Sequence, residues 1–390
     1  MKKAFASIAF YIKKTDRMIL IPCILLSVCS LILLFGILQT DYIVRLRFDS
    51  RSLVVQFSAV MLGFVAAVIL SNIDYEAYTK SWKIHVPLCY LAMIATFIWG
   101  RGAVGRLEDK RWLEIPFVGI SVQPSEFLKI SFILVFAYHI YLAHKEINHP
   151  KHVFLLCLHG AIPVVLTHFQ GDDGTALSLL VIFFCMMLLS GINWKYIASL
   201  LTGVGIAVPL VWLFILKPWQ KLRITALWNP PDQATISDAL AAELEKYLHQ
   251  QEQAKMAIGT GEIFGKGLFA DNHVYVPEIH SDFIFSFYAE SFGLAGALIF
   301  IVVMLILCLR LLYNSSKCED IQGKAICVGI FAMITFPALY NMGMNLSMLP
   351  VMGNPMPFFS YGGSSMLTNF IAIGIALSVY MNKRKFTIFD

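Results

Sequence analysis

Pro277-Glu278-Ile279-His280-Ser281-Asp282 is followed at once by an apolar run that begins Phe283-Ile284-Phe285 and continues to residue 309. This run is long enough to cross a bilayer, since a spanning helix needs roughly 20 apolar residues. Asp282 therefore stands where a polar segment enters the membrane. Ionisable groups there are costly and usually functional, so Asp282 is our candidate catalytic base. An alternative stays open, because Asp is also a favoured helix N-cap.

The rest of the chain is also strongly apolar. Of its 390 residues 58% are apolar and only 14% charged, with a mean hydropathy of +0.71, whereas soluble domains carry about 25% charged residues. We predict an all-α polytopic membrane protein of about ten transmembrane helices, forming a single membrane-embedded domain over residues 1–390. The predicted spans are 18–38, 53–72, 84–100, 125–143, 153–167, 175–191, 196–216, 283–309, 325–345 and 366–382.

The distribution of Lys and Arg predicts the orientation. An even number of spans puts both termini on one side, and the loops of that side carry 16 Lys and Arg, against 7 in the short loops of the other side. Because cytoplasmic loops are enriched in these residues, both termini are predicted to be cytoplasmic. The net charge of +5 is explained by these loops and does not call for nucleic acid.

The segment 217–282 is the long extracytoplasmic loop of this topology, and it carries Asp282. It is much longer than a connection needs to be, so it is either functional or disordered. Thr235 and Asp238 resemble a capping box, and the apolar residues that follow fall on one helical face. We expect an amphipathic helix here, either lying on the membrane surface or packed on other outer loops.

The other polar motifs fall on the same, outer side of the membrane. A purely structural set would have no reason to segregate in this way. Together with the 277–282 segment, these motifs supply the candidate substrate-binding residues, which are Arg101, Arg111, Gln123, Ser125, Glu126, Lys129, Asp172, His280, Ser281, Ser360, Gly362, Gly363 and Ser364.

Each of these motifs also has a simpler explanation. Glu126 and Lys129 share a helix face, and they form either a polar floor for a charged ligand or an ion pair that compensates itself. Asp172 lies in a Gly-bounded turn, where turn chemistry is common. The Gly362–Ser364 segment offers backbone N–H groups to an anion, or only starts a helix. A lone histidine such as His280 is often structural.

Glu290 is predicted to be a structural polar residue deep in the eighth span, on the same helix face as Asp282. It needs a cationic or hydrogen-bonded partner, and Lys129 is one candidate. The eight cysteines show no metal-ligand spacing, so no protein-built metal site is expected.

Three motifs resemble the hallmarks of the SEDS family (shape, elongation, division and sporulation). They are Gln123-Pro-Ser-Glu-x-x-Lys129, Pro277-Glu-x-His-x-Asp282-Phe-Ile-Phe and Ser360-Tyr-Gly-Gly-Ser364. The resemblance implies a ten-span peptidoglycan glycosyltransferase. It would polymerise lipid II at the outer face of the cytoplasmic (inner) membrane, together with a class B penicillin-binding protein. The resemblance implies that Asp282 corresponds to the family's essential acid, and that Glu126 and Lys129 correspond to its polar pair.

Within the family, the segments 255–261 and 264–268 are more similar to the elongation members than to the division members. The chain also departs from the family pattern. Ser281 replaces a threonine, the turn at 170–175 differs, and roughly ten extra residues lie around 231–249, a surplus that loops tolerate.

The implied chemistry suits these residues. A carboxylate within reach of the acceptor sugar hydroxyl can act as a general base. The lipid pyrophosphate leaving group needs cations or N–H donors, for which Lys129, Arg111 and Arg101 are the charged candidates. A divalent cation, Mg²⁺ or Mn²⁺, could share this task, although the sequence shows no dedicated ligand cluster.

Two other classes of function are weighed against the enzyme. A transporter, such as a flippase for the same lipid, often has repeated halves with broken helices and a site near the bilayer midplane. We detect no such halves, and the motifs cluster at the outer rim. A non-catalytic scaffold would need neither Asp282 nor a buried Glu126 and Lys129.

Overall fold

The computed structural model describes residues 11, 13–40, 48–102, 110–115, 120–216, 218–227 and 238–386. Within these residues, nine helices are long and apolar enough to cross a membrane, and α8 (Asp173–Leu189) is a shorter apolar helix. The predicted all-α polytopic fold is confirmed, and these ten apolar helices correspond to the ten predicted spans.

The elements have their longer connections around α10 and α11 and in residues 346–362, before α14. Besides α8 they are α2 (Arg17–Ile37), α3 (Ser50–Ser71), α4 (Tyr75–Lys80), α5 (Trp82–Trp99), β1 (Leu113–Ile115), β2 (Ile120–Val122), α6 (Pro124–Ala143), η2 (His144–Glu146), α7 (Pro150–Phe169), α9 (Trp194–Leu210), η3 (Val211–Ile215), α10 (Pro218–Thr225), α11 (Asp238–Thr260), α12 (Ile284–Lys317), α13 (Ile321–Asn345) and α14 (Gly363–Phe386).

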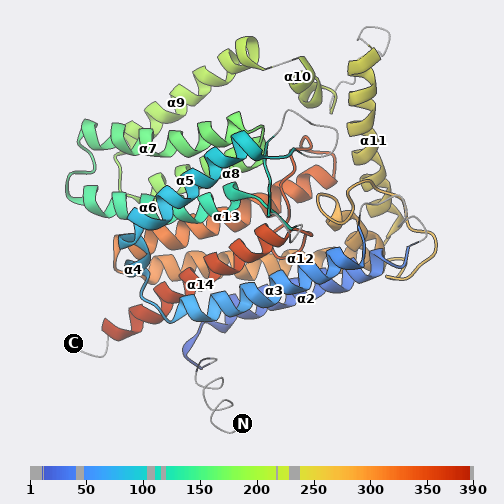
Figure 1. Ribbon diagram of the computed structural model, residues 1–390, viewed down its shortest axis with the longest axis horizontal. Helices are drawn as coiled ribbons and strands as arrows, with labels where there is room; N and C mark the ends of the chain where they lie inside the picture. Colours follow the sequence, from blue (N-terminus) through green and yellow to red (C-terminus); the bar gives the residue numbers. More distant parts are fainter. Residues whose placement is uncertain are drawn as a thin grey trace.

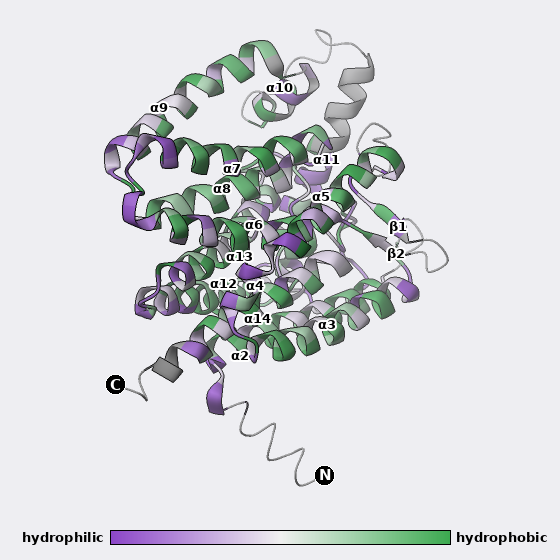
Figure 2. Cartoon of the chain, turned by 60° about the vertical axis from the view of Figure 1, so that its left-hand side comes forward, coloured by the Kyte–Doolittle hydropathy of each residue, from purple (hydrophilic) through white to green (hydrophobic). Residues whose placement is uncertain are grey.

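The spanning helices form a bundle around α13 (Figure 1). This helix packs on α12, α8, α6 and α14, while α3 packs along α14. In Figure 1, α2 begins and α14 ends at the left-hand end of the bundle, and α11 stands upright at the other end. Apolar residues also dominate the outward-facing sides of the helices (Figure 2), as expected for a surface that meets lipid.

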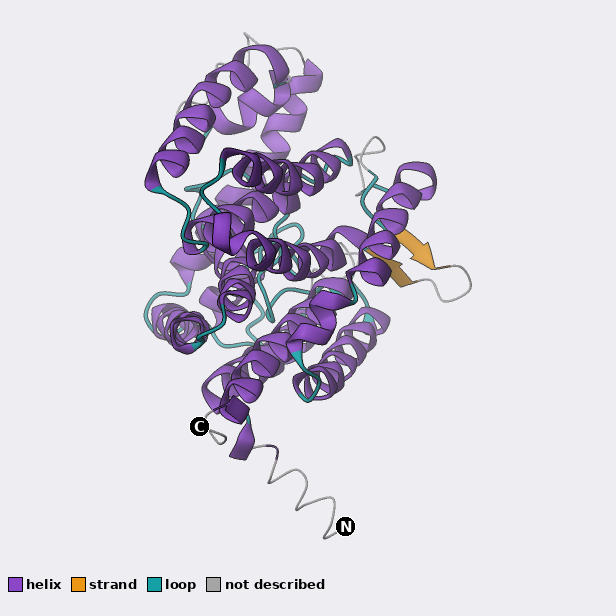
Figure 3. Ribbon diagram, turned by 90° about the vertical axis from the view of Figure 1, so that its left-hand side faces the viewer, coloured by secondary structure: helices purple, strands orange, loops and turns teal. Residues whose placement is uncertain are grey.

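Two of the helices begin with residues that direct polar groups to the end where α11 lies. Pro124 stands in the first turn of α6, where the missing N–H of proline costs nothing. The side chain of Asp172 caps α8. Between α5 and α6 the chain makes a short antiparallel hairpin, β1–β2, which holds the only strands of the described residues (Figure 3).

The helix α12 is interrupted at Gly293, so the predicted single span 283–309 is wrong in this detail. Gly293 has φ 67° and ψ −167°, which are not helical values, and a Cβ there would lie 2.4 Å from the carbonyl oxygen of Ile263. The backbone of the 261–267 segment enters the break. Its residues form four backbone hydrogen bonds with residues 290–295, which satisfy the interrupted helix ends.

The long predicted loop 217–282 contains α10 and α11, so it is not a disordered connection. The capping residue Thr235 lies outside the described residues, but the predicted helix is present from Asp238. Gln250, Gln251, Ala254 and Ala257 of its second half are buried, and α11 packs on α12 and α13. For this half, packing on protein is confirmed; contact of the helix with the membrane surface stays a prediction.

Candidate active site

Asp282 lies directly before α12. The N-cap residue of α12 is Phe283, whose side chain makes no capping hydrogen bond, so Asp282 precedes the N-cap position. Its backbone carbonyl accepts hydrogen bonds from Asn341 and Asn345 of α13, at 2.9 and 3.1 Å. The residue is half-buried. The backbone of Asp282 is therefore held in the bundle by two asparagines of α13.

The loop between α13 and α14 lies next to both this carboxylate and a cation. An ideal Cβ on Gly353 would lie 3.7 Å from Oδ2 of Asp282 and 3.7 Å from Nη1 of Arg111. The two charged groups therefore border one small space that Gly353, lacking a side chain, leaves open. Gly353 also has φ 64°, which favours glycine.

Arg111 is almost buried, with 7% of its surface exposed. Its Nη2 donates to the carbonyl oxygen of Gly171, and its Nη1 lies 3.9 Å from Oδ1 of Asp172. Its backbone N–H donates to the carbonyl of Arg101, next to the isolated bridge between Arg101 and Trp112 that precedes β1. The turn between α7 and α8 thus fixes a planar guanidinium beside the space at Gly353.

Asp172 connects the beginnings of α6 and α8. Its Oδ2 accepts hydrogen bonds from Nε2 of Gln123 at 2.6 Å and from Oγ of Ser125 at 3.1 Å. Its Oδ1 accepts from the backbone N–H of Thr175 at 3.3 Å, which makes the cap of α8. Asp172 thus caps α8 at the turn and also binds polar side chains at the start of α6.

Glu126 and Lys129 form an ion pair inside the bundle. Nζ of Lys129 lies 2.8 Å from Oε1 of Glu126, and their side chains are 6% and 2% exposed. Oε2 of Glu126 also accepts a hydrogen bond from Thr368 of α14, at 3.2 Å. The pair therefore compensates its own charges and joins α6 to α14.

Lys129→Met is expected to destabilise the protein by about 3–5 kcal/mol, because removal of one partner leaves the other charge buried and uncompensated. The double variant Glu126→Gln/Lys129→Met removes both charges and should recover most of this loss. Thermal melting of the purified variants in detergent measures both effects. A single variant that melts like the parent would show that the pair does not stabilise the bundle.

The sequence model of the FtsW/RodA/SpoVE family, whose members are called cell cycle proteins, matches residues 16–385. The chain belongs to this family, the SEDS family. Among curated SEDS relatives it is 28% identical to the peptidoglycan glycosyltransferase MrdB of Escherichia coli K12, over 83% of this chain and 84% of that protein. It is 30% identical to MrdB of Helicobacter pylori, over 87% and 88%.

The chain is also 30% identical to a probable peptidoglycan glycosyltransferase FtsW of Hydrogenovibrio crunogenus, over 85% of this chain and 82% of that one. Solved structures share the SEDS fold. One, of a peptidoglycan synthase complex that coordinates polymerization and crosslinking, matches with TM-score 0.74 and 22% identity, covering 95% of this chain and 98% of the other. Thermus thermophilus RodA matches with TM-score 0.67 and 21% identity, covering 95% and 97%.

The second and third SEDS motifs are joined by hydrogen bonds. Oγ of Ser360 donates to the carbonyl of Ser281 at 2.6 Å and accepts from the N–H of Met356 at 2.9 Å. Oγ of Ser281 bonds the carbonyl and the carboxylate of Glu278, at 3.3 and 3.2 Å. The two hydroxyls thus shape the loops on either side of the site.

His280 has a structural environment. Its ring packs against Phe48 and Tyr361, with centroids 5.1 and 5.6 Å apart, and its carbonyl accepts the N–H of Tyr361. Burial lowers the pKa of His280, although the nearby Glu278 carboxylate opposes this effect. A neutral, stacked ring supports the structural interpretation of this histidine.

The predicted anion site at Gly362–Ser364 is only partly available. The N–H of Gly362 already donates to Oε1 of Gln56, at 3.1 Å. Oγ of Ser364 accepts from the N–H of Gln123, at 3.2 Å. Because α14 begins at Gly363, the backbone of Gly363 and Ser364 remains a candidate, whereas Gly362 does not.

The guanidinium of Arg101 is exposed and pairs with Glu114 of β1, and its role in substrate binding stays a prediction. The predicted partner of Glu290 needs correction. Glu290 pairs not with Lys129 but with Nζ of Lys266 at 2.6 Å and with His273 at 3.0 Å.

Glu290 also does not share a continuous helix face with Asp282, because α12 begins only at Ile284. The carboxylate of Glu290 instead accepts the N–H of Val274 at 2.9 Å, besides its two ionic partners. It therefore fastens the 266–274 segment to the N-terminal part of α12, in keeping with the predicted structural role.

Sequence reasoning missed three buried amides, Gln56, Asn341 and Asn345, none of which is exposed to solvent. Gln56 of α3 donates from Nε2 to the carbonyl of Ser360. The sequence feature that could have identified them is an amide side chain within a predicted span, because polar groups there need partners.

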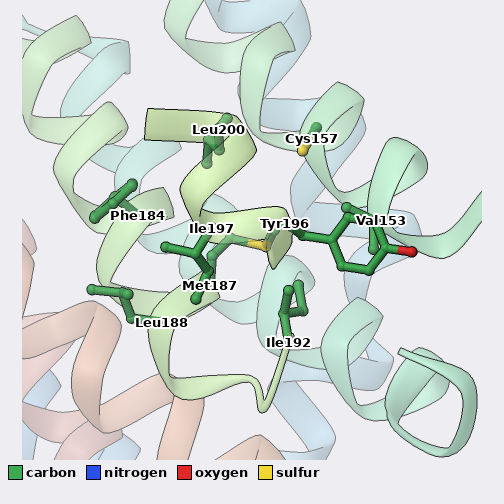
Figure 4. A pocket seen from close by; sticks show the side chains of 9 residues that line it. All are labelled: Val153, Cys157, Phe184, Met187, Leu188, Ile192, Tyr196, Ile197 and Leu200. Carbon is green, nitrogen blue, oxygen red and sulfur yellow. The ribbon is translucent and has the colours of Figure 1, made fainter. Parts of the chain in front are cut away.

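The best-defined pocket does not coincide with this site. It is an apolar hollow between the beginning of α9 and the helices α7 and α8 (Figure 4). Its lining side chains are Val153, Cys157, Phe184, Met187, Leu188, Ile192, Tyr196, Ile197 and Leu200. Its lining holds no Asp, Glu, His, Lys or Arg, so it suits an apolar chain better than a charged substrate.

Proposed function

We propose that this protein is a peptidoglycan glycosyltransferase that polymerises lipid II into β-1,4 glycan strands, with Asp282 as general base. The observation that carries the proposal is the space at Gly353, which the Asp282 carboxylate and the Arg111 guanidinium both border. Glycosyl transfer from a lipid pyrophosphate needs a base and a cation close together. The names of the curated relatives support the same reaction class.

The reaction assigns one role to each charged group. The acceptor sugar hydroxyl gives its proton to Asp282 while its oxygen bonds to the anomeric carbon of the donor. The bond from that carbon to the pyrophosphate oxygen breaks, and its electron pair leaves with the pyrophosphate. Arg111 stabilises the developing negative charge. Attack opposite the leaving group inverts the configuration of the anomeric carbon, so an α-linked donor gives a β-linked product.

The remaining candidates support these two groups in our proposal. Asp172 holds Arg111, and Gln123 and Ser125 hold Asp172 through its other oxygen. Lys129 acts through its ion pair with Glu126 rather than as a free cation for the pyrophosphate. The backbone N–H groups of Gly363 and Ser364, at the start of α14, remain proposed donors to the lipid-linked substrate.

A divalent cation, Mg²⁺ or Mn²⁺, is a further proposal for the leaving group. Within the described ranges no group of three or more His, Cys, Asp or Glu could hold a metal. Mg²⁺ is nevertheless often bound by one or two carboxylates together with substrate phosphates. Such a cation would be held mainly by the substrate's own phosphate oxygens and would supply positive charge to the pyrophosphate.

We further propose that the protein works in cell elongation, in the cytoplasmic (inner) membrane, with both termini cytoplasmic and Asp282 facing outward. The excess of Lys and Arg on the terminal side supports this orientation. The proposed partner is a class B penicillin-binding protein. The fold shared with a complex that coordinates polymerization and crosslinking supports a partner of this kind.

Purified protein in detergent or vesicles, supplied with lipid II and the partner, tests the proposal. We expect long glycan strands, seen by gel separation of labelled product and digested by a muramidase. Lipid II that crosses vesicle membranes without any glycan product would contradict the polymerase and favour a flippase. Absence of both activities would favour a scaffold.

A further inference from the structure

Two asparagines stand one helical turn apart on α13, the most central helix of the bundle. Neither Asn341 nor Asn345 is exposed to solvent, and residues four apart lie on one helix face. A buried amide is costly unless its donors and acceptor are used. Their hydrogen bonds therefore show what the amides hold in place.

The amide nitrogen of Asn341 is fully used by two loops. Its Nδ2 donates to the carbonyl oxygen of Asp282 at 2.9 Å and to that of Asn354 at 2.9 Å. An amide has two N–H donors, so this one group ties the backbone before α12 to the loop before α14. The second loop carries Gly353, where the carboxylate and the guanidinium meet.

Asn345 completes the arrangement. Its Nδ2 also donates to the carbonyl of Asp282, at 3.1 Å, and to Oδ1 of Asn341, at 3.0 Å. Its Oδ1 accepts the N–H of Ser286, in the first turn of α12, at 3.1 Å. The backbone on both sides of Phe283 is thereby fixed to α13.

We propose that Asn341, supported by Asn345, is a positioning residue that sets the distance between the Asp282 carboxylate and the space at Gly353. The proposal rests on the proposed role of Asp282 as the base. Both amides donate to the backbone carbonyl oxygen of Asp282, so they act on its backbone position. A displacement of about 1 Å in a reacting group costs roughly 10²-fold in rate.

Asn341→Leu and Asn341→Asp test the inference on the full-length protein. Leucine removes both donors, and aspartate keeps the shape but turns an oxygen toward the two carbonyls. We expect kcat for lipid II polymerisation to fall by roughly 10²-fold in both variants, with little change in KM. Asn369→Leu is the matched control, because Asn369 is also a buried helical asparagine, and its amide nitrogen donates to Oγ of Ser365 within α14.

Binding of lipid II separates positioning from folding. Asp282→Asn and Asp282→Asn/Asn341→Leu should bind lipid II equally well, since the inference concerns the base and not the binding surface. Weaker binding by the double variant, an unchanged kcat in the single variants, or loss of the melting transition in both would each overturn it. If Asp282→Asn itself kept full activity, the proposed function would fail instead, whatever Asn341 does.

Discussion

Asp282→Asn is expected to insert and fold normally and to polymerise lipid II about 10²–10⁴-fold more slowly than the parent, the usual contribution of a general base. The amide keeps the shape of the side chain but cannot take the proton of the acceptor hydroxyl. Its backbone carbonyl still accepts from Asn341 and Asn345, so the loop should stay in place. Initial rates of glycan formation by purified protein measure the loss.

Asp271→Asn is the matched control for this variant. Asp271 is exposed and lies in the same outer segment, between α11 and α12, so its amide should leave the rate unchanged. Asp282→Asn that polymerises at the parental rate would refute the assignment of the base.

Arg111→Met should lower kcat/KM for lipid II by about 10²–10³-fold, the cost typical of one lost donor to a developing negative charge. Asp172 keeps its bonds from Gln123, Ser125 and Thr175, so its carboxylate is not left without partners. Arg111→Lys keeps the charge but loses the planar fork, and it should recover only part of the rate. Steady-state kinetics at several lipid II concentrations measure these effects.

Arg101→Met provides the comparison at the neighbouring arginine, whose carbonyl bonds the backbone N–H of Arg111. The guanidinium of Arg101 is exposed and paired with Glu114, and exposed ion pairs contribute little stability. We expect a much smaller loss than for Arg111→Met. Equal losses for the two arginines would argue that net charge near the site matters and not the fixed position of Arg111.

The spans could be predicted from the sequence because length and hydropathy alone decide whether a helix crosses a bilayer. The first predicted span, 18–38, differs from α2 by one residue at each end. The break at Gly293 could not be predicted in this way. A glycine in an apolar run is compatible with a straight helix, and only the approach of the 261–267 backbone excludes one here.

The site could be predicted as a region but not as a set of contacts. The segregation of polar motifs on one side of the membrane correctly predicted that Gln123, Ser125 and Asp172 lie close together. The predicted partner of Glu290, Lys129, was wrong, because a charge deep in a span can pair with a side chain from any neighbouring segment. Asn341 and Asn345 escaped notice since a single amide in an apolar run says nothing about which backbone it will hold.

The interruption of α12 has a mechanical consequence for the site. An unbroken rod of 34 residues would act as a lever, carrying each tilt of its inner part to the carboxylate at its tip. Here the N-terminal part of α12, residues 284–292, is joined to the 261–267 segment by backbone hydrogen bonds beside the break at Gly293. Leu294 and Ala295, beyond the break, bond the same segment. We therefore expect the 261–267 segment to hold both parts of α12 and to limit how far a tilt of residues 294–317 displaces the carboxylate.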